Sequence, residues 1–100
     1  PNLPFGHKQT LYRITQEALH NIVKHAKATQ VNVSLKELDQ HVQLCIEDKG
    51  IGFDVNENFS QRLGLKSMRE RTESLGGHFE INSTLGQGTT ITITIPRGEL

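Results

Sequence analysis

Apolar residues recur at helical spacing in the first third of the chain, from about His7 to Ala28. They fall three or four positions apart, and no glycine or proline interrupts the segment. This spacing places them on one face of an amphipathic helix, which buries that face against the rest of the fold. The predicted stripe consists of Leu11, Ile14, Ala18, Ile22 and Ala26.

The next segment changes to a period of two, which is typical of strands. Apolar residues alternate with polar ones in two runs, and Asp39-Gln40 between the runs is a plausible turn. Residues 31–47 are therefore predicted to form a hairpin. Its alternating apolar positions are Val31, Val33 and Leu35 in the first strand and Val42, Leu44 and Ile46 in the second.

Residues 49–63 are rich in Gly, Asn, Asp and Ser, which is typical of a loop. A second helix is expected over about 65–75, and Gly76-Gly77 can end it in a left-handed conformation. A third strand is expected to start near Phe79. From Thr90 to Ile95, threonine alternates with isoleucine, which predicts a fourth strand with one buried face.

The order helix, two strands, helix, two strands predicts the fold class. Hairpins pair antiparallel, and two amphipathic helices need one sheet face to cover. We expect a two-layer α/β (α+β) sandwich with a mixed, largely antiparallel sheet covered on one face by helices. Residues 1–100 form a single domain on this view. Four strands make a thin sheet and leave room for a further strand from outside this sequence.

Composition narrows the function classes. The 11 basic and 11 acidic residues cancel, so nucleic-acid binding is not expected, because it needs a basic excess. Cys45 is the only cysteine, which excludes an internal disulfide and predicts a small half-buried residue. No apolar run is long enough to span a bilayer, and no signal peptide is visible. The chain starts at Pro1 without a methionine, so we expect a domain of a longer protein.

A mixed polar row follows the flank of the first helix. Glu17, Asn21, Lys24 and His25 are spaced to share one face. A Mg²⁺–phosphate site would use such residues, with the Asn21 carbonyl oxygen as a metal ligand. Lys24 or His25 would meet phosphate oxygens, and Glu17 would orient a water or accept a proton. The row taken alone is more simply a solvated face with ordinary i,i+4 pairs.

The segment Asp48-Lys49-Gly50-Ile51-Gly52-Phe53 directly follows a strand. Gly50 and Gly52 permit backbone conformations closed to other residues and allow a ligand to come close. The Asp48 carboxylate at a pocket floor can accept a hydrogen bond from an exocyclic amine such as that of adenine. A glycine-rich turn that Asp48 merely caps explains the same residues equally well.

Two further glycine-containing stretches fit an anion or nucleotide pocket. Gly64-Leu65 opens the second helix, and free N–H groups at a helix start favour anions. In Gly86-Gln87-Gly88-Thr89-Thr90, the glycines would let the strands pass close to a nucleotide. Thr89 or Thr90 would then form hydrogen bonds near Asp48. Each stretch alone is more simply a helix start or a hairpin turn.

Together these stretches resemble the catalytic and ATP-binding domain of sensor histidine kinases, with the closest match to the nitrate/nitrite-sensor branch. The family's N box corresponds to residues 16–26 and its G1 box to 48–53. The element after this branch's short lid corresponds to 64–71, and the last glycine box to 86–90. The resemblance runs over about 11–96, and the ordered set is far more specific than any one box.

The resemblance implies the Bergerat fold shared with gyrase, heat-shock-ninety and mismatch-repair ATPases, with ATP and Mg²⁺ as cofactors. Asn21 would hold Mg²⁺, Asp48 would bind the adenine amine, and residues 54–63 would form the lid over the phosphates. Glu17 and Lys24 would be catalytic. The remaining ATP-binding residues would be His25, Gly50, Gly52, Gly64, Leu65, Gly86, Gly88, Thr89 and Thr90.

The family transfers the γ-phosphoryl group of ATP to a histidine on a separate dimerisation domain, and a response regulator acts downstream. By resemblance, we expect the fragment to be a monomeric cytoplasmic domain whose parent is membrane-anchored or soluble. Three alternatives stay open. They are an anti-sigma-factor-type serine kinase, another Bergerat-fold ATPase, and a non-enzymatic interaction domain that would use residues 90–95 as an edge strand.

Overall fold

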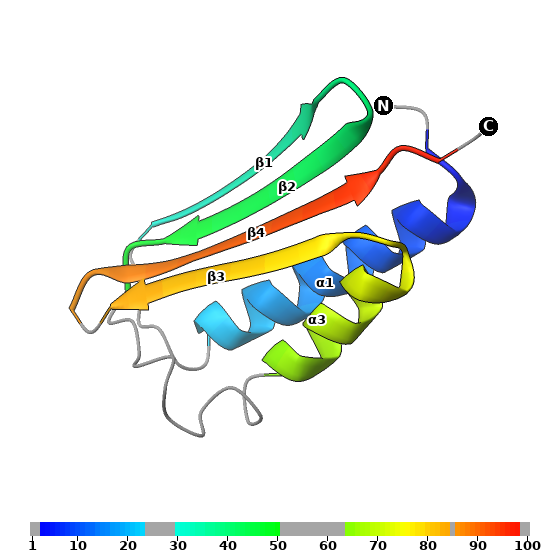
Figure 1. Ribbon diagram of the computed structural model, residues 1–100. Coiled ribbons are helices and arrows are strands. Elements are labelled where there is room, and N and C mark those ends of the chain that lie inside the picture. Colours follow the sequence, from blue (N-terminus) through cyan, green and yellow to red (C-terminus); the bar gives the residue numbers. More distant parts are fainter. Residues whose placement is uncertain (1–2, 24–29, 51–63, 85, 99–100) are drawn as a thin grey trace.

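The computed structural model describes residues 3–23, 30–50, 64–84 and 86–98. Two helices cover one face of a four-stranded sheet, which confirms the predicted two-layer α/β class (Figure 1). Every pairing among the described strands is antiparallel, in the order β1-β2-β4-β3. The elements are α1 (Phe5–Asn21), β1 (Val31–Glu37), β2 (His41–Asp48), α3 (Leu65–Ser74), β3 (His78–Thr84) and β4 (Gly88–Pro96).

Helix α1 begins at Phe5, directly after Pro4, two residues earlier than the apolar spacing predicts. Proline favours a helix start because its fixed φ suits the entry and it has no N–H to leave unpaired. The predicted apolar stripe is confirmed over its first four positions, where all side chains are buried against the sheet and α3. These positions are Leu11, Ile14, Ala18 and Ile22, whereas Ala26 lies outside the described residues.

Helix α3 packs its face of Leu65, Met68 and Thr72 into the same core. It ends in the left-handed conformation predicted for this site, with Gly76 at φ 75°. The N–H of Gly77 donates to the Thr72 carbonyl at 3.0 Å, and that of Gly76 donates to Glu73 at 2.9 Å. These two bonds form a Schellman motif, which turns the chain directly into β3.

The central strands β2 and β4 each supply three buried apolar side chains to the core. Their inward side chains alternate with half-exposed polar ones, as the period of two predicts. Register sets Ile46 opposite Ile91 and Leu44 opposite Ile93, so apolar side chains meet across the pair. Cys45 is a free, half-buried thiol on the other face of β2, in agreement with its prediction.

The strand predicted as a possible edge is central, and the edges of the described sheet are β1 and β3. Residues 90–95 were a candidate edge strand, but β4 lies between β2 and β3, so both of its sides are paired. Among the described strands, β1 pairs only with β2, and all seven of its residues are exposed. Its inward positions Val31, Val33 and Leu35 are exposed, so neither described helix buries them.

The two ends of the described chain meet at one corner of the molecule (Figure 1). A Cβ atom placed on Gly98 would lie 3.0 Å from Cγ of Pro4, so the Gly98 backbone packs against the Pro4 ring. Neither described helix has the length and apolar character needed to cross a membrane.

Candidate functional site

The predicted site residues that the structure describes gather at the end of the molecule opposite the Pro4–Gly98 corner. The antiparallel sheet and the helix directions bring the last residues of α1 and β2 to this end, together with the first residues of α3 and β4 (Figure 1). Three stretches predicted to share a pocket therefore lie at one end of the fold, although they are far apart in the sequence. They are the described part of the N box (residues 16–23), the start of the G1 box and the final glycine box.

Asp48 is the last residue of β2, and its side chain is only 4% exposed. Its position continues the inward alternation of Val42, Leu44 and Ile46, so the strand itself directs the carboxylate to the helix-covered face. The N–H of Gly50 donates to Asp48 Oδ1 at 2.7 Å. A buried carboxylate needs such partners, since burial without them costs several kcal/mol. Asp48 therefore caps the glycine-rich turn, as one of the two interpretations predicted. It is also buried, as the other interpretation, a ligand-binding carboxylate, requires.

Gly88 brings β4 against the Asp48 backbone. It has φ 91°, and a Cβ atom there would overlap the Asp48 carbonyl oxygen and lie 3.2 Å from Lys49 Cα. Only glycine combines this conformation with this approach. Gly86 also has a positive φ, yet nothing lies within 4 Å of a Cβ placed there. Gly86 is therefore required only for the left-handed conformation of the turn, whereas Gly88 also allows β4 to pack closely against the backbone of Asp48.

The β2–β4 register distinguishes Thr89 from Thr90, the two threonines predicted as alternative hydrogen-bonding residues near Asp48. Thr89 pairs with Asp48 and shares its face of the sheet, whereas Thr90 pairs with Glu47 on the opposite face. The Thr89 hydroxyl lies 2.8 Å from that of Ser83, and the Ser83 hydroxyl donates to the Gly88 carbonyl. These contacts fix Thr89 at the pocket end of β4.

Glu17 lies against the start of α3, a contact that the sequence did not reveal. A Cβ atom on Gly64 would overlap the Glu17 carboxylate and lie 2.8 Å from its Cδ. Gly64 is the N-cap of α3 with φ 71°, and no side chain caps this helix. The carboxylate thus lies at the positive end of a helix dipole, where an anion is stabilised. The predicted anion site at Gly64-Leu65 therefore already faces a negative group.

Asn21 is the last residue of α1 and is half-buried, one helical turn beyond Glu17. Several predicted site residues lie outside the described part of the chain: Lys24, His25, Gly52 and the lid residues 54–63. Within the described ranges, no three His, Cys, Asp or Glu side chains cluster as a metal site.

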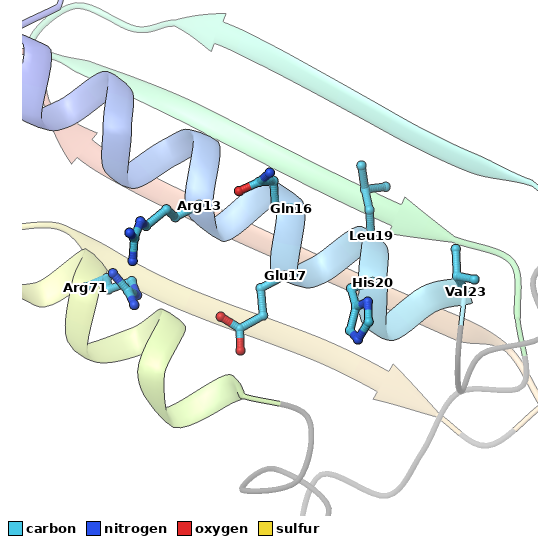
Figure 2. Close-up of a pocket in the computed structure, with 7 residues that line it drawn as sticks. All are labelled: Arg13, Gln16, Glu17, Leu19, His20, Val23 and Arg71. Carbon is cyan, nitrogen blue, oxygen red and sulfur yellow. The ribbon is translucent and has the colours of Figure 1, made fainter.

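An open groove of about 820 Å³ follows the outer side of α1 and reaches α3 at Arg71. Its lining includes Arg13 and Arg71, which point toward one another from the two helices (Figure 2). Neither arginine was predicted as a site residue from the sequence. A signal existed, because Arg13 precedes Glu17 by one turn and Arg71 flanks the buried Met68 at i+3.

Comparison with known proteins gives the same picture. Residues 6–99 match the family described as "Histidine kinase-, DNA gyrase B-, and HSP90-like ATPase". The sensor protein VraS of Staphylococcus epidermidis is 43% identical over 94 residues, which are 94% of this chain and 27% of the relative. VraS of Staphylococcus aureus matches to the same extent. The chain therefore spans about a quarter of the length of these relatives.

Solved structures agree in fold. The histidine kinase domain of the blue-light activated kinase EL346 from Erythrobacter litoralis superposes with a TM-score of 0.80 at 22% identity, covering 94% of this chain and 46% of that one. The ATP binding domain of PrrB from Mycobacterium tuberculosis gives 0.76 at 24% identity, covering 91% and 69%. With the family match spanning nearly all residues, this chain belongs to the histidine kinase-, DNA gyrase B- and HSP90-like ATPase family.

Proposed function

We propose that this chain is the catalytic domain of a two-component sensor histidine kinase. It binds ATP and transfers the γ-phosphoryl group to a histidine on a separate dimerisation domain. The observation that carries this proposal is the buried Asp48 carboxylate, flanked by Gly88 and Thr89 where α1 ends and α3 begins. The similarity to sensor proteins supports the choice of this branch of the family.

Asp48 would recognise the base. Its carboxylate accepts hydrogen bonds only, so it fits the exocyclic amine of adenine and disfavours guanine, which presents a carbonyl there. Gly50 already donates to one carboxylate oxygen and thereby holds the side chain in place. Thr89 lies beside Asp48 on the same face and would contribute a hydroxyl near the base. Gly88 keeps β4 close enough for both groups to reach one ligand.

The phosphate tail would extend toward the ends of α1 and α3. The first N–H groups of α3, at Gly64-Leu65, would bind phosphate oxygens after the flexible Glu17 carboxylate has rotated away from Gly64. The Asn21 carboxamide oxygen suits Mg²⁺, which takes few protein ligands and keeps several waters. Mg²⁺ bound there would neutralise charge on the phosphate oxygens. Glu17 reaches the α3 start and would orient the attacking group or accept its proton.

The remaining assignments extend the proposal beyond the described residues. Lys24 and His25 would stabilise the negative charge of the phosphates or donate hydrogen bonds to them. Residues 54–63 would form a lid over the phosphates. A response regulator would receive the phosphoryl group downstream. The domain would be monomeric and cytoplasmic, in a parent kinase that is membrane-anchored or soluble.

The test is calorimetric titration of the chain with ATP and Mg²⁺, comparing wild type with Asp48→Asn. The asparagine carboxamide carries no charge in either orientation of its side chain. In one of the two orientations it also turns its N–H₂ group, a donor, toward the adenine amine, which is a donor as well. We expect ATP affinity to fall about 10- to 100-fold, as for loss of a charge-assisted hydrogen bond. Glu47→Gln is the matched control, since it removes a carboxylate from the adjacent, half-buried position on the opposite face of β2.

Absence of adenine-nucleotide binding by the wild type would refute the proposal, as would equal losses in both variants. The acceptor is tested separately with labelled ATP and the parent's dimerisation domain. Acid-labile phosphohistidine supports the kinase assignment, whereas acid-stable phosphoserine on a partner would replace it with a serine kinase.

A further inference from the structure

Glu17 is a half-buried acidic residue whose carboxylate no other side chain holds. Among the described residues it forms no hydrogen bond and no ion pair. Its side chain extends from α1 toward the start of α3 (Figure 2), where it lies against Gly64. The positive end of the α3 dipole offsets part of the cost of burying this charge. The carboxylate is therefore held by contact and by the field of the helix, and rotation of its side chain can carry it away.

The start of α3 has no anion of its own. Gly64 is the N-cap and has no side chain to accept a hydrogen bond, and the first turn of the helix contains no acidic residue. The three atoms nearest to a Cβ placed on Gly64 all belong to Glu17. A carboxylate from α1 therefore lies where, in the proposed function, phosphate oxygens of the nucleotide would lie.

Two anions cannot share the start of α3 without repulsion. A metal-free triphosphate would bring several negative charges to within a few Å of the Glu17 carboxylate, and such repulsion is stronger in a half-buried site than in water. Rotation of the side chain removes the overlap at Gly64, but the charge stays attached to the same position of α1. Binding of a metal-free nucleotide is therefore opposed by Glu17 in every orientation of its side chain.

A divalent cation reverses the sign of this interaction. Asn21, the residue proposed to hold Mg²⁺, lies one helical turn beyond Glu17 on the same side of α1. The Glu17 carboxylate would attract a cation at that position, and the cation would neutralise charge on the phosphate oxygens. The same carboxylate therefore opposes bare phosphates and favours phosphates that carry a metal ion.

We propose that Glu17 is a specificity-determining residue that makes nucleotide binding depend on the divalent cation. It disfavours metal-free ATP and favours Mg-ATP, so that cation and nucleotide bind cooperatively. The inference rests on the proposed function, and it gives Glu17 a binding role in addition to the part in phosphoryl transfer proposed above. This binding role precedes the transfer step, so it can be measured without an acceptor domain.

The experiment titrates the chain with ATP by calorimetry, once in excess Mg²⁺ and once in EDTA. The ratio of the Kd in EDTA to the Kd in Mg²⁺ measures the coupling between cation and nucleotide. We expect Glu17→Gln to lower this ratio about tenfold, because the carboxamide keeps the shape of the side chain and removes its charge. Metal-free ATP should bind this variant more tightly than it binds the wild type, whereas Mg-ATP should not.

Adenosine separates an effect on the phosphates from an effect on the base. It has no phosphate, so its affinity, measured by competition with Mg-ATP, should be the same for the wild type and for Glu17→Gln. Glu17→Asp keeps the charge on a shorter side chain and should keep the ratio closer to that of the wild type. Binding of Mg-ATP by each variant also shows that its pocket is folded.

Glu73→Gln is the matched control, since it removes one carboxylate from an exposed position near the other end of α3. The ratio should stay unchanged in this variant, and a fall as large as that in Glu17→Gln would attribute the effect to net charge and overturn the inference. An unchanged ratio in Glu17→Gln overturns it as well, as does an equal gain in affinity for adenosine. A wild type that binds no ATP even with Mg²⁺ present would instead refute the proposed function, and the role of Glu17 with it.

Discussion

Gly64 and Gly88 each let another part of the chain come closer than a Cβ atom would permit. At Gly88 the neighbour is backbone, the carbonyl of Asp48, which cannot move without breaking the β2–β4 pairing. At Gly64 the neighbour is the end of the flexible Glu17 side chain. The same glycine chemistry therefore has different consequences, because a carboxylate can rotate away and a strand cannot.

Replacement of Gly64 by alanine should destabilise the domain more than replacement of Gly86. Both residues have positive φ, 71° and 83°, so both variants carry the left-handed strain of about 1–2 kcal/mol. Gly64→Ala also displaces the Glu17 carboxylate, whereas Gly86 has open space. We expect Gly64→Ala to cost about 1 kcal/mol more in the free energy of unfolding, measured by urea denaturation.

A double-mutant cycle isolates the Glu17 contact. In a Glu17→Ala background the carboxylate is absent, so the difference between the Gly64→Ala and Gly86→Ala costs should shrink toward zero. A difference that persists in this background would show that Gly64 is required for another reason.

Among the elements, α3 shows how a buried polar residue is accommodated. Thr72 is fully buried, and its hydroxyl donates to the Met68 carbonyl within the same helix at 2.8 Å. Its methyl group lies against the turn at Gly77, where an added Cβ would come within 3.0 Å of it. The hydroxyl needs nothing outside its own helix, whereas the methyl group fills space between α3 and the sheet.

Thr72→Val and Thr72→Ser should therefore differ in stability. Valine keeps the shape and leaves no donor unpaired, so we expect a change within about 0.5 kcal/mol. Serine keeps the hydrogen bond and loses a buried methyl group, which costs about 1 kcal/mol. Urea unfolding of both variants checks the order, and a larger loss for valine would show that the hydroxyl matters more than packing.

The sequence predicted the elements well because their signals are local. The α1 stripe, the 31–47 hairpin and the Gly76 stop all follow from spacings or residue types within one element. Strand order does not, since the alternation in residues 90–95 is compatible with an edge or a central strand. The exposure of Val33 could not be predicted either. Alternation shows which side chains share one face of a strand, but it does not show whether a helix covers that face.

For the candidate site, the sequence predicted that Asp48 and the last glycine box would meet, and the register confirms their adjacency. It did not predict the contact between Glu17 and Gly64 or the facing of Arg13 and Arg71. Both depend on how α1 and α3 lie side by side, and no residue within either helix determines that packing. The roles of Asn21, Lys24 and His25 stay predictions.

At the scale of the molecule, the large exposed apolar residues of the described ranges are concentrated in a few elements. The large exposed apolar side chains of the described residues belong to α1, β1 and the turn that follows β1: Phe5, Tyr12, Leu19, Val23, Val31, Val33, Leu35 and Leu38. An edge strand with such side chains can template pairing with another chain when the fold loosens. The only positive charge within β1 is Lys36.

Val33→Lys should slow aggregation of the domain on heating. The lysine places a charge at the middle of the exposed inward face of β1, and that face is 47% exposed at Val33, so the folded state should tolerate it. Light scattering during a thermal ramp measures the effect. Ser34→Lys adds the same charge on the other face and should protect less; equal protection would attribute the effect to net charge alone.

The contact between Pro4 and Gly98 has a mechanical consequence. Chain joined to either residue would attach at the same corner, so a rotation at that corner would move the whole domain as a lever. The long axis of the molecule is 41 Å, and the Asp48 end lies far from that corner. A swing of about 15° would carry the opposite end through about 10 Å, enough to deliver or withdraw a bound nucleotide without altering the pocket itself.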